Sequence, residues 1–198
     1  MNTNAIIVHK LGGPEEMIWQ EVELSSPKEN EVLIKQTAIG LNFIDTYFRS
    51  GLYPAQLPTP LGMEAAGVIE EIGPGVTEFQ IGDRVAYASA PLGSYAEKRI
   101  FPINNLVKIP DDISDELAAS IMLKGMTAEY LIRRTFKVKS GQTVLFHAAA
   151  GGVGLIACQW LKSIGANVIG TVGSNEKAEL ARANGCEHTI LYKEESFV

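Results

Sequence analysis

The stretch TVLFHAAAGGVGLIACQWLKSIGANVIGTV, residues 143–172, decides the fold of this chain. It predicts a buried strand over 143–148, a helix over 152–165 and a second buried strand over 167–172. Because the connections are so short, the two strands are expected to run parallel, with a right-handed crossover through the helix. The glycines lie where the first strand turns into the helix, and in such a fold this is where a nucleotide-binding turn occurs.

The turn departs from the usual G-x-G-x-x-G pattern. Ala149 takes the first position, Gly151 and Gly154 take the other two, and Gly152 is an extra glycine between them. Small residues there allow a sharp turn, close approach of a pyrophosphate and tight packing of helix on strand. The helix start near Gly152 would direct N–H groups and a positive dipole end at the pyrophosphate. The alternative is a set of small residues that only packs a helix on a sheet. The flanking strands favour nucleotide binding.

The end of the second strand indicates which nucleotide. Sites selective for NAD place Asp or Glu there, about 20 residues after the glycines, to bind the ribose 2′-OH. This chain has Thr171 to Ser174 at that point and Lys177 one turn later. A hydroxyl and an ammonium could hold a 2′-phosphate, so the sequence predicts NADPH over NADH. The alternatives are that Ser174 is only a helix N-cap and that Lys177 is a solvated surface lysine.

Beyond this core the pattern continues with a helix over 174–185 and a strand over 188–192. Three strands make only the first half of a doubly wound domain, so we expect a chain truncated at its C-terminus. Upstream, short β-like runs broken by Gly and Pro predict an antiparallel barrel or sandwich. Helical spacing begins after Asp111, Asp112 and Ser114, the capping candidates. We therefore predict two domains, 1–124 and 125–198.

Composition limits the classes of function. The 198 residues are 46% hydrophobic and 20% charged, with a net charge of −6, which is typical of a globular protein and gives no support to a nucleic-acid or anionic-membrane partner. No apolar run is long enough for a signal peptide or a membrane span. Cys158 and Cys186 show no pairing or metal-ligand spacing, and the three histidines show no triad spacing. A cytoplasmic protein without disulfides is expected.

Several motifs together resemble a known family. They are AIGLNFIDTYFRSGLYP (38–54), LGMEAAGVIEEIGPGV (61–76), GDRVAYA (82–88), LKGMTAEYLIRRT (123–135) and LFHAAAGGVGLIACQWLKSIGA (145–166). The chain resembles the zinc-independent, zeta-crystallin-like quinone oxidoreductases among the medium-chain dehydrogenases/reductases. The resemblance implies an α/β chain, with a GroES-like β-barrel domain followed by the first half of a Rossmann domain and NADPH in the cleft between them. It further implies hydride or electron transfer to a quinone, and a homodimer for the full-length protein.

The resemblance also implies site residues at the matching positions. On the nicotinamide and substrate side these are Asn42, Asp45, Tyr47 and Tyr53. Around the cofactor they are Asn42, Thr127, Ala150, Gly151, Gly152, Val153, Gly173, Ser174, Lys177 and Tyr192. By themselves, Asn42 and Asp45 could equally be turn or cap residues, and the two tyrosines could be aromatics at the edge of the core.

The same comparison of motifs argues against a metal. Zinc-dependent relatives carry a Gly-His-Glu motif, whereas this chain has Met63 at the histidine position and no cysteine before Cys158. Because these ligands are missing, we expect no metal. Without zinc no Lewis acid polarises the substrate, so we expect a reaction that needs little electrophilic help. Quinones meet that condition because hydride addition yields an aromatic hydroquinone anion. The alternatives are an enoyl or alkenal reductase on the same scaffold and an inactive nucleotide-binding fragment.

Overall fold

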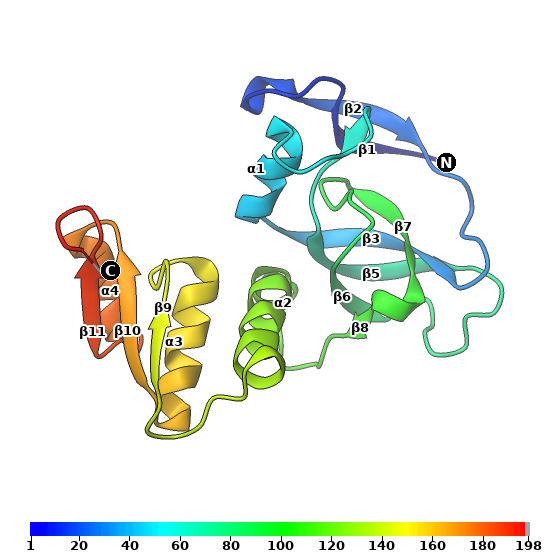
Figure 1. Cartoon of the computed structure of the whole chain (residues 1–198). Helices are drawn as coiled ribbons and strands as arrows, with labels where there is room; N and C mark the ends of the chain where they lie inside the picture. Colours follow the sequence, from blue (N-terminus) through cyan, green and yellow to red (C-terminus); the bar gives the residue numbers. More distant parts are fainter. Residues whose placement is uncertain (197–198) are drawn as a thin grey trace. The chain divides into compact units, whose positions relative to one another are not determined.

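The computed structural model describes residues 1–196, and the last two residues of the predicted second domain, Phe197 and Val198, lie outside the described residues. The chain divides into two compact units, Met1–Leu123 and Lys124–Val198. Figure 1 shows a first unit built mainly from β-strands and a second unit in which strands and helices alternate.

The first unit contains two antiparallel sheets. One has the strand order β2-β1-β4 and the other the order β7-β3-β5-β6-β8. The strands are β1 (Asn2–Val8), β2 (Met17–Glu23), β3 (Glu31–Gly40), β4 (Thr59–Pro60), β5 (Glu64–Ile72), β6 (Arg84–Ala88), β7 (Lys98–Pro102) and β8 (Val107–Lys108). The helices are α1 (Phe43–Ser50) and the 3-10 turns η1 (Pro14–Glu16) and η2 (Ile103–Asn105).

The core of the larger sheet forms from alternate residues of its strands, as the two-residue side-chain period of a strand requires. Ile34, Ile69 and Tyr87 are all buried there. The ring of Tyr87 stacks on Phe101 with 4.2 Å between centroids, and the Arg99 guanidinium lies over both rings. Burial raises the pKa of Tyr87 to about 12, although Arg99 acts in the opposite direction, so this hydroxyl stays protonated.

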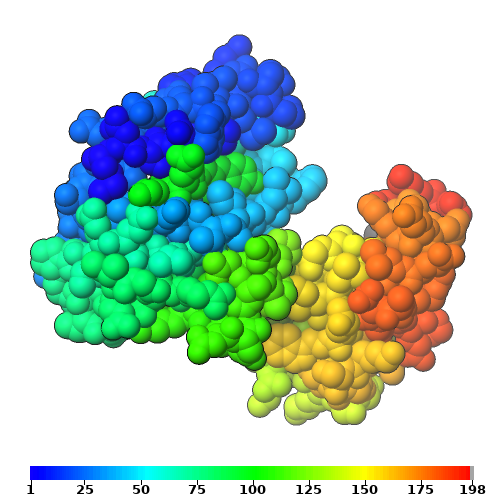
Figure 2. All heavy atoms as spheres, turned by 180° about the vertical axis from the view of Figure 1, so that it is seen from behind, coloured from blue at the N-terminus to red at the C-terminus, as the bar shows by residue number. Residues whose placement is uncertain are grey.

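Distant parts of the sequence interleave in the first unit. A backbone N–H of β1, that of Ile6, donates to the Tyr95 carbonyl at 2.7 Å, and Ala5 forms an isolated bridge with Ala96. Figure 2 accordingly shows green atoms set among the blue atoms of the N-terminal strands. In the second unit the colours change in chain order from yellow through orange to red. The first unit therefore depends on long-range pairing far more than the second.

The second unit is a three-stranded parallel sheet of order β11-β10-β9 with helices between the strands. Its elements are β9 (Thr143–Phe146), α3 (Gly152–Ile164), β10 (Asn167–Val172), α4 (Asn175–Ala183) and β11 (His188–Leu191). Leu161 of α3, Val168 of β10 and Ala181 of α4 are buried in one core. The predicted strand–helix–strand order and the parallel pairing are confirmed, as is the α/β fold class.

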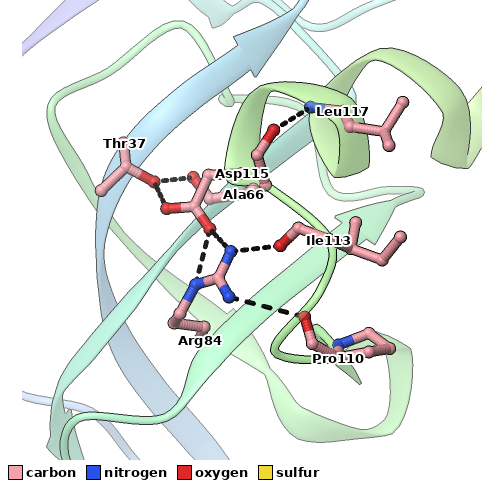
Figure 3. Close-up of polar contacts among 8 residues, drawn as sticks. Thr37, Ala66, Arg84, Pro110, Ile113, Asp115 and Leu117 are labelled. Carbon is pink, nitrogen blue, oxygen red and sulfur yellow. Dashed lines mark hydrogen bonds and ion pairs between the residues drawn. The ribbon is translucent and has the colours of Figure 1, made fainter.

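Helix α2 (Asp115–Glu129) follows the first unit's strands and continues into a π-helical turn, η3 (Tyr130–Thr135). Of the three predicted caps, Ser114 is the one that acts, because its Oγ accepts from the Leu117 N–H at 3.2 Å. Figure 3 shows how the N-terminus of α2 is attached: Asp115 accepts from Arg84 Nη2 at 2.6 Å and from the Thr37 hydroxyl. Arg84 also donates to the Ile113 carbonyl at 2.6 Å, so one guanidinium ties the loop and the helix to β6.

Two elements in the first unit were missed by the sequence patterns. The helix α1 carries Phe, Ile, Thr and Tyr, which favour strands, but a capping box at Asn42 and a left-handed Gly51 (φ +84°) define it as a helix. The strand β2 has its side chains largely at the surface, so it lacks the apolar alternation expected of a half-buried strand. The predicted strand over 143–148 ends earlier, at Phe146, because Ala148 adopts φ +52°.

The two cysteines, whose spacing in the sequence indicated no pairing, lie next to each other in the structure. Cys158 of α3 and Cys186, between α4 and β11, are both buried and their sulfurs lie 3.4 Å apart as free thiols. Burial, with a smaller effect of the neighbouring thiol, raises the pKa of Cys158 to about 12. Both residues therefore pack as small apolar groups in the second unit's core. No helix among residues 1–196 is both long and apolar enough to cross a membrane.

Candidate functional site

The glycine turn of the second unit links β9 to α3. The Gly151 N–H donates to the Ala148 carbonyl at 2.8 Å, and the Ala149 N–H donates to the Thr171 carbonyl of β10 at 3.2 Å. The first intrahelical bond is that from the Leu155 N–H to the Gly151 carbonyl, at 2.9 Å. The N–H groups of the helix's first turn, including those of Gly152 and Val153, therefore point out of the N-terminus, where an anion is favoured.

Gly152 and Gly154 differ in what an added side chain would contact. A Cβ on Gly154 would lie 2.4 Å from the Ala148 oxygen and 2.6 Å from the Ala149 oxygen, so only glycine allows the helix to approach the turn this closely. For a Cβ on Gly152 the nearest atoms belong to the side chain of Lys124, with its Cδ at 2.9 Å. The fold therefore requires glycine at position 154, because backbone atoms occupy the space beside it. At position 152 the nearest atoms belong to a side chain, which can move.

Four of the predicted cofactor residues gather at the carboxyl ends of β10 and β11. A Cβ on Gly173 would lie 2.7 Å from the Tyr192 hydroxyl, so the two residues are in close proximity. Ser174 is the N-cap of α4, and its Oγ accepts from the Lys177 N–H at 3.3 Å. The cap role that the sequence left open for Ser174 is therefore present. The first turn of α4 also contains Glu176, an acid that the sequence argument did not weigh.

The other predicted cofactor residues of this unit lie around the turn and on α2. Ala150 and Val153 are half-buried on either side of the two central glycines, and both pack against the core of the second unit. Thr127 is half-buried on α2, next to the buried Ala128 of the same core. The functional assignments of these residues stay predictions.

In the first unit, Asn42 and Asp45 belong to a buried polar group that we call the Asn42 cluster. Its members are Asn42, Asp45, Glu64 and Tyr95. The Asn42 N–H donates to Asp45 Oδ2 at 2.9 Å, Asn42 Nδ2 donates to Glu64 Oε2 at 2.7 Å, and the Tyr95 hydroxyl donates to Asp45 Oδ2 at 2.7 Å. Asn42 caps α1, which is the cap role that the sequence left open.

The Asn42 cluster borders a cavity of about 170 Å³ in the first unit. Asn42, Asp45 and Tyr95 all line it, together with apolar side chains that include Leu61. Burial, helped by the hydrogen bond to Asp45 and its charge, raises the pKa of Tyr95, so its hydroxyl remains a proton donor to Asp45. Glu64 and Tyr95 were missed by sequence reasoning, because their partners are distant in the chain. For Glu64 the available signals were its apolar neighbours and its place at the glutamate of the Gly-His-Glu motif, next to Met63.

The predicted tyrosines lie in an exposed aromatic group on and after α1. The Tyr47 ring is 5.4 Å from Phe43, edge to face, and 5.2 Å from Tyr53. Phe43 is 74% exposed and its neighbour Leu41 is 77% exposed. Tyr47 and Tyr53 are thus brought together at the surface and not in the core, beside the residues that cap α1. The planes of Tyr47 and Phe43 are 84° apart and those of Tyr47 and Tyr53 are 54° apart, so the rings pack edge to face and tilted.

No group of three or more His, Cys, Asp or Glu side chains within residues 1–196 is arranged to hold a metal ion. His147 Nδ1 lies 3.1 Å from the Thr171 hydroxyl, which ties the start of the glycine turn to β10. These two residues join the turn and the second strand a second time, beyond the backbone bond from Ala149.

The arrangement defines a class of protein: an antiparallel β unit followed by a parallel nucleotide-binding unit of the dehydrogenase type. Residues 28–111 match the "Alcohol dehydrogenase GroES-like domain" family and residues 152–198 match the "Zinc-binding dehydrogenase" family. The chain therefore carries the two domain types of the medium-chain dehydrogenase/reductase family, and relatives that it resembles are named quinone oxidoreductases.

Individual relatives refine this placement. A quinone oxidoreductase of Pseudomonas aeruginosa is 54% identical over 93% of this chain and 57% of its own length. A 2-haloacrylate reductase of Burkholderia sp. is 49% identical over 98% of this chain and 60% of its own length. The crystal structure of Escherichia coli quinone oxidoreductase complexed with NADPH superposes with a TM-score of 0.93 at 49% identity, covering 98% of this chain and 60% of that one. The chain thus spans about three-fifths of the length of these relatives.

Proposed function

We propose that this chain carries the cofactor-binding turn and the substrate-side residues of an NADPH-dependent quinone oxidoreductase. The single observation that carries the proposal is the glycine turn, because no side chain caps its helix N-terminus by a hydrogen bond and its glycines put no Cβ where a pyrophosphate would approach. The E. coli quinone oxidoreductase, 49% identical, was crystallised with NADPH. The donor set at the turn fits such a cofactor.

Bound NADPH would supply a hydride from its nicotinamide ring, and the chain's own residues bind and orient. We assign the pyrophosphate to the turn residues Ala150, Gly151, Gly152 and Val153. Ser174, Lys177 and Tyr192, with Gly173, would surround the 2′-phosphate, because Ser174 and Tyr192 follow β10 and β11 directly and Lys177 is in the first turn of α4. We assign Thr127 to the nicotinamide end.

On the substrate side, we propose that the half-buried ring of Tyr47 and the exposed ring of Tyr53 contact the quinone and that Asn42 and Asp45 line its approach. Quinone reduction needs no metal, since hydride addition is stabilised by the aromaticity of the product, and protons can come from a tyrosine hydroxyl or from water. We place the domain boundary at residues 124 and 125. A homodimer and a cytoplasmic location are proposed on the resemblance of the sequence to its family.

The test is a fluorescence titration with NADPH, followed by loss of near-ultraviolet NADPH absorbance on adding 1,4-benzoquinone. It is run on this chain and on a chimera that appends, after residue 198, the remaining C-terminal part of the P. aeruginosa relative. Binding and turnover by the chimera are expected. A well-folded chimera that neither binds NADPH nor oxidises it would refute the reductase proposal. Binding without turnover would favour the alternative of a nucleotide-binding protein.

A second candidate is reduction of an electron-poor alkene. The specific observation is the 49% identity to a 2-haloacrylate reductase over 98% of this chain. A panel that contains 1,4-benzoquinone, an α,β-unsaturated aldehyde and 2-chloroacrylate separates the two. The quinone proposal expects the highest kcat/KM with the quinone, and a preference for either alkene would transfer the proposal to alkene reduction.

A further inference from the structure

Glu64 is a fully buried acid, 0% exposed, at the first residue of β5. A buried carboxylate is costly unless each of its oxygens is hydrogen-bonded. Here Oε2 accepts from Asn42 Nδ2 at 2.7 Å and Oε1 accepts from the Leu123 N–H of α2 at 2.7 Å. Both oxygens face N–H donors, which is the arrangement that a carboxylate, with acceptors only, satisfies.

The residues around Glu64 leave space for its side chain. A Cβ on Gly40, the last residue of β3, would lie 2.5 Å from Glu64 Oε2 and 2.1 Å from the Ala119 carbonyl oxygen of α2. Glycine at this position therefore leaves room for both the carboxylate and the helix. The two residues after Glu64 in β5, Ala65 and Ala66, are fully buried and apolar, so packing of the strand alone does not call for an acid.

The contact fixes the orientation of the Asn42 side chain. A carboxamide can present either its oxygen or its NH2 group, and the two ends have nearly the same shape. Glu64 accepts only, so the Asn42 NH2 group must face it, and the Asn42 oxygen must face the opposite way, toward the capping box of α1. Asn42 also lines the 170 Å³ cavity, so its orientation decides which hydrogen-bonding group that cavity presents.

We propose that Glu64 is a positioning residue: it fixes the Asn42 carboxamide for cofactor or substrate binding and ties that residue to α2 through the Leu123 N–H. The catalytic part of this proposal, that Glu64 positions Asn42 for cofactor or substrate binding, rests on the proposed function. The structural part, that Glu64 holds Asn42 and the Leu123 N–H together, rests only on the observed hydrogen bonds. Aspartate would be one carbon too short to reach both partners, and glutamine offers only one acceptor to two donors.

The structural part is tested by exchanging the amide and the carboxylate between positions 42 and 64. Asn42→Asp alone would set two buried carboxylates against each other and should lower the melting temperature sharply. Adding Glu64→Gln lets the new amide accept from the Leu123 N–H and donate to the new carboxylate, so the double variant should recover most of the loss. Recovery supports the proposal. Additive losses in the double variant would overturn it.

The catalytic part is tested with the chimera described above, using Glu64→Gln, Asn42→Ala, their combination and the control Asp115→Asn. Asp115 lies at the N-terminal end of α2, and its hydrogen-bond partners are Thr37 and Arg84, which are not members of the Asn42 cluster. Glu64→Gln should lower kcat/KM about tenfold or more in the wild-type background, since small misplacements of a positioning group cost that much. In the Asn42→Ala background it should change kcat/KM less than about twofold.

Different outcomes separate the two proposals. If the chimera of wild-type sequence has no NADPH turnover, the proposed function fails while the exchange experiment still decides the structural role of Glu64. If the wild type turns over but Glu64→Gln is equally harmful with and without Asn42, Glu64 does not act through Asn42. A loss from Asp115→Asn as large as that from Glu64→Gln would show general loosening of α2 and would also overturn the inference.

Discussion

The glycine turn of the second unit and the Asn42 cluster of the first unit are held by different kinds of contact. The turn uses backbone groups close in sequence, such as the Gly151 N–H and the Ala148 carbonyl, and its shape depends on where side chains are absent. The Asn42 cluster uses side chains that come from positions 42, 45, 64 and 95, and its shape depends on every donor meeting an acceptor. Substitutions should therefore disrupt the glycine turn by steric overlap and the Asn42 cluster by loss of hydrogen bonds.

The largest effect is expected from breaking the turn at Gly154. Gly154→Val would place a branched side chain against two backbone carbonyl oxygens that cannot move aside, and should cost about 3 kcal/mol or more of unfolding free energy. Gly152→Val is the matched control, because the atoms nearest to its Cβ belong to a lysine side chain and not to backbone. It should change stability little yet abolish NADPH binding. Thermal unfolding and NADPH titration of both variants decide the point, and full NADPH affinity in Gly152→Val would mean that the pyrophosphate binds elsewhere.

A smaller loss is expected from the Asn42 cluster. Tyr95→Phe removes the hydroxyl that donates to Asp45 Oδ2 and leaves a buried carboxylate with one donor fewer, at a cost of about 2 kcal/mol. Tyr53→Phe, at an exposed tyrosine of the same unit, should be neutral for stability. Urea unfolding measures both variants. Equal stability of Tyr95→Phe and wild type would show that the hydrogen bond to Asp45 is not what maintains the cluster.

The cap of α4 separates local structure from cofactor choice. Ser174→Asp keeps a good N-cap but adds a negative charge where we place the 2′-phosphate, so NADPH affinity should fall about tenfold, ~1.4 kcal/mol, with NADH affinity and the melting temperature retained. Lys177→Ala should likewise weaken NADPH far more than NADH. Glu176→Gln, which removes a negative charge next to Lys177, should not weaken NADPH. Paired titrations with both nucleotides measure this, and equal losses for NADPH and NADH would remove the 2′-phosphate assignment.

The smallest effect concerns the attachment of α2 in Figure 3. Burial alone would raise the pKa of Asp115, but the hydrogen bonds from Thr37 and Arg84 and the charge of Arg84 outweigh it and hold that pKa below the usual 3.8. A lowered pKa in the folded state means that the stabilisation is present above the unfolded value and is lost as pH falls through the folded value. Asp115→Asn should therefore cost about 1 kcal/mol at neutral pH and progressively less below about pH 4. Urea unfolding across this pH range checks the trend, which a pH-independent difference would contradict.

The two regions also differ in how far the sequence predicted them. The second unit was predictable because its signals are local: an apolar strand, a run of small residues, a helix ending at Gly165 and a second strand follow one another directly. Helix α1 was missed because its residues favour strands and its helical state comes from the caps at Asn42 and Gly51. The roles of the candidate residues of the turn and of α1 stay predictions, while the partners of Glu64 and Tyr95 became visible only in the tertiary structure.

By itself, the sequence determined the α/β class, the strand–helix order around the turn and the resemblance to the family. All of these depend on residue spacing within one or two elements, where the chain needs no closure of a long loop to express them. Only the tertiary structure decided that Glu64 faces Asn42 and Leu123, that Tyr95 reaches Asp45 and that the sulfurs of Cys158 and Cys186 touch. Those contacts join residues far apart in the chain, and burial selects them by requiring a partner for each polar group and a filled volume around each apolar one.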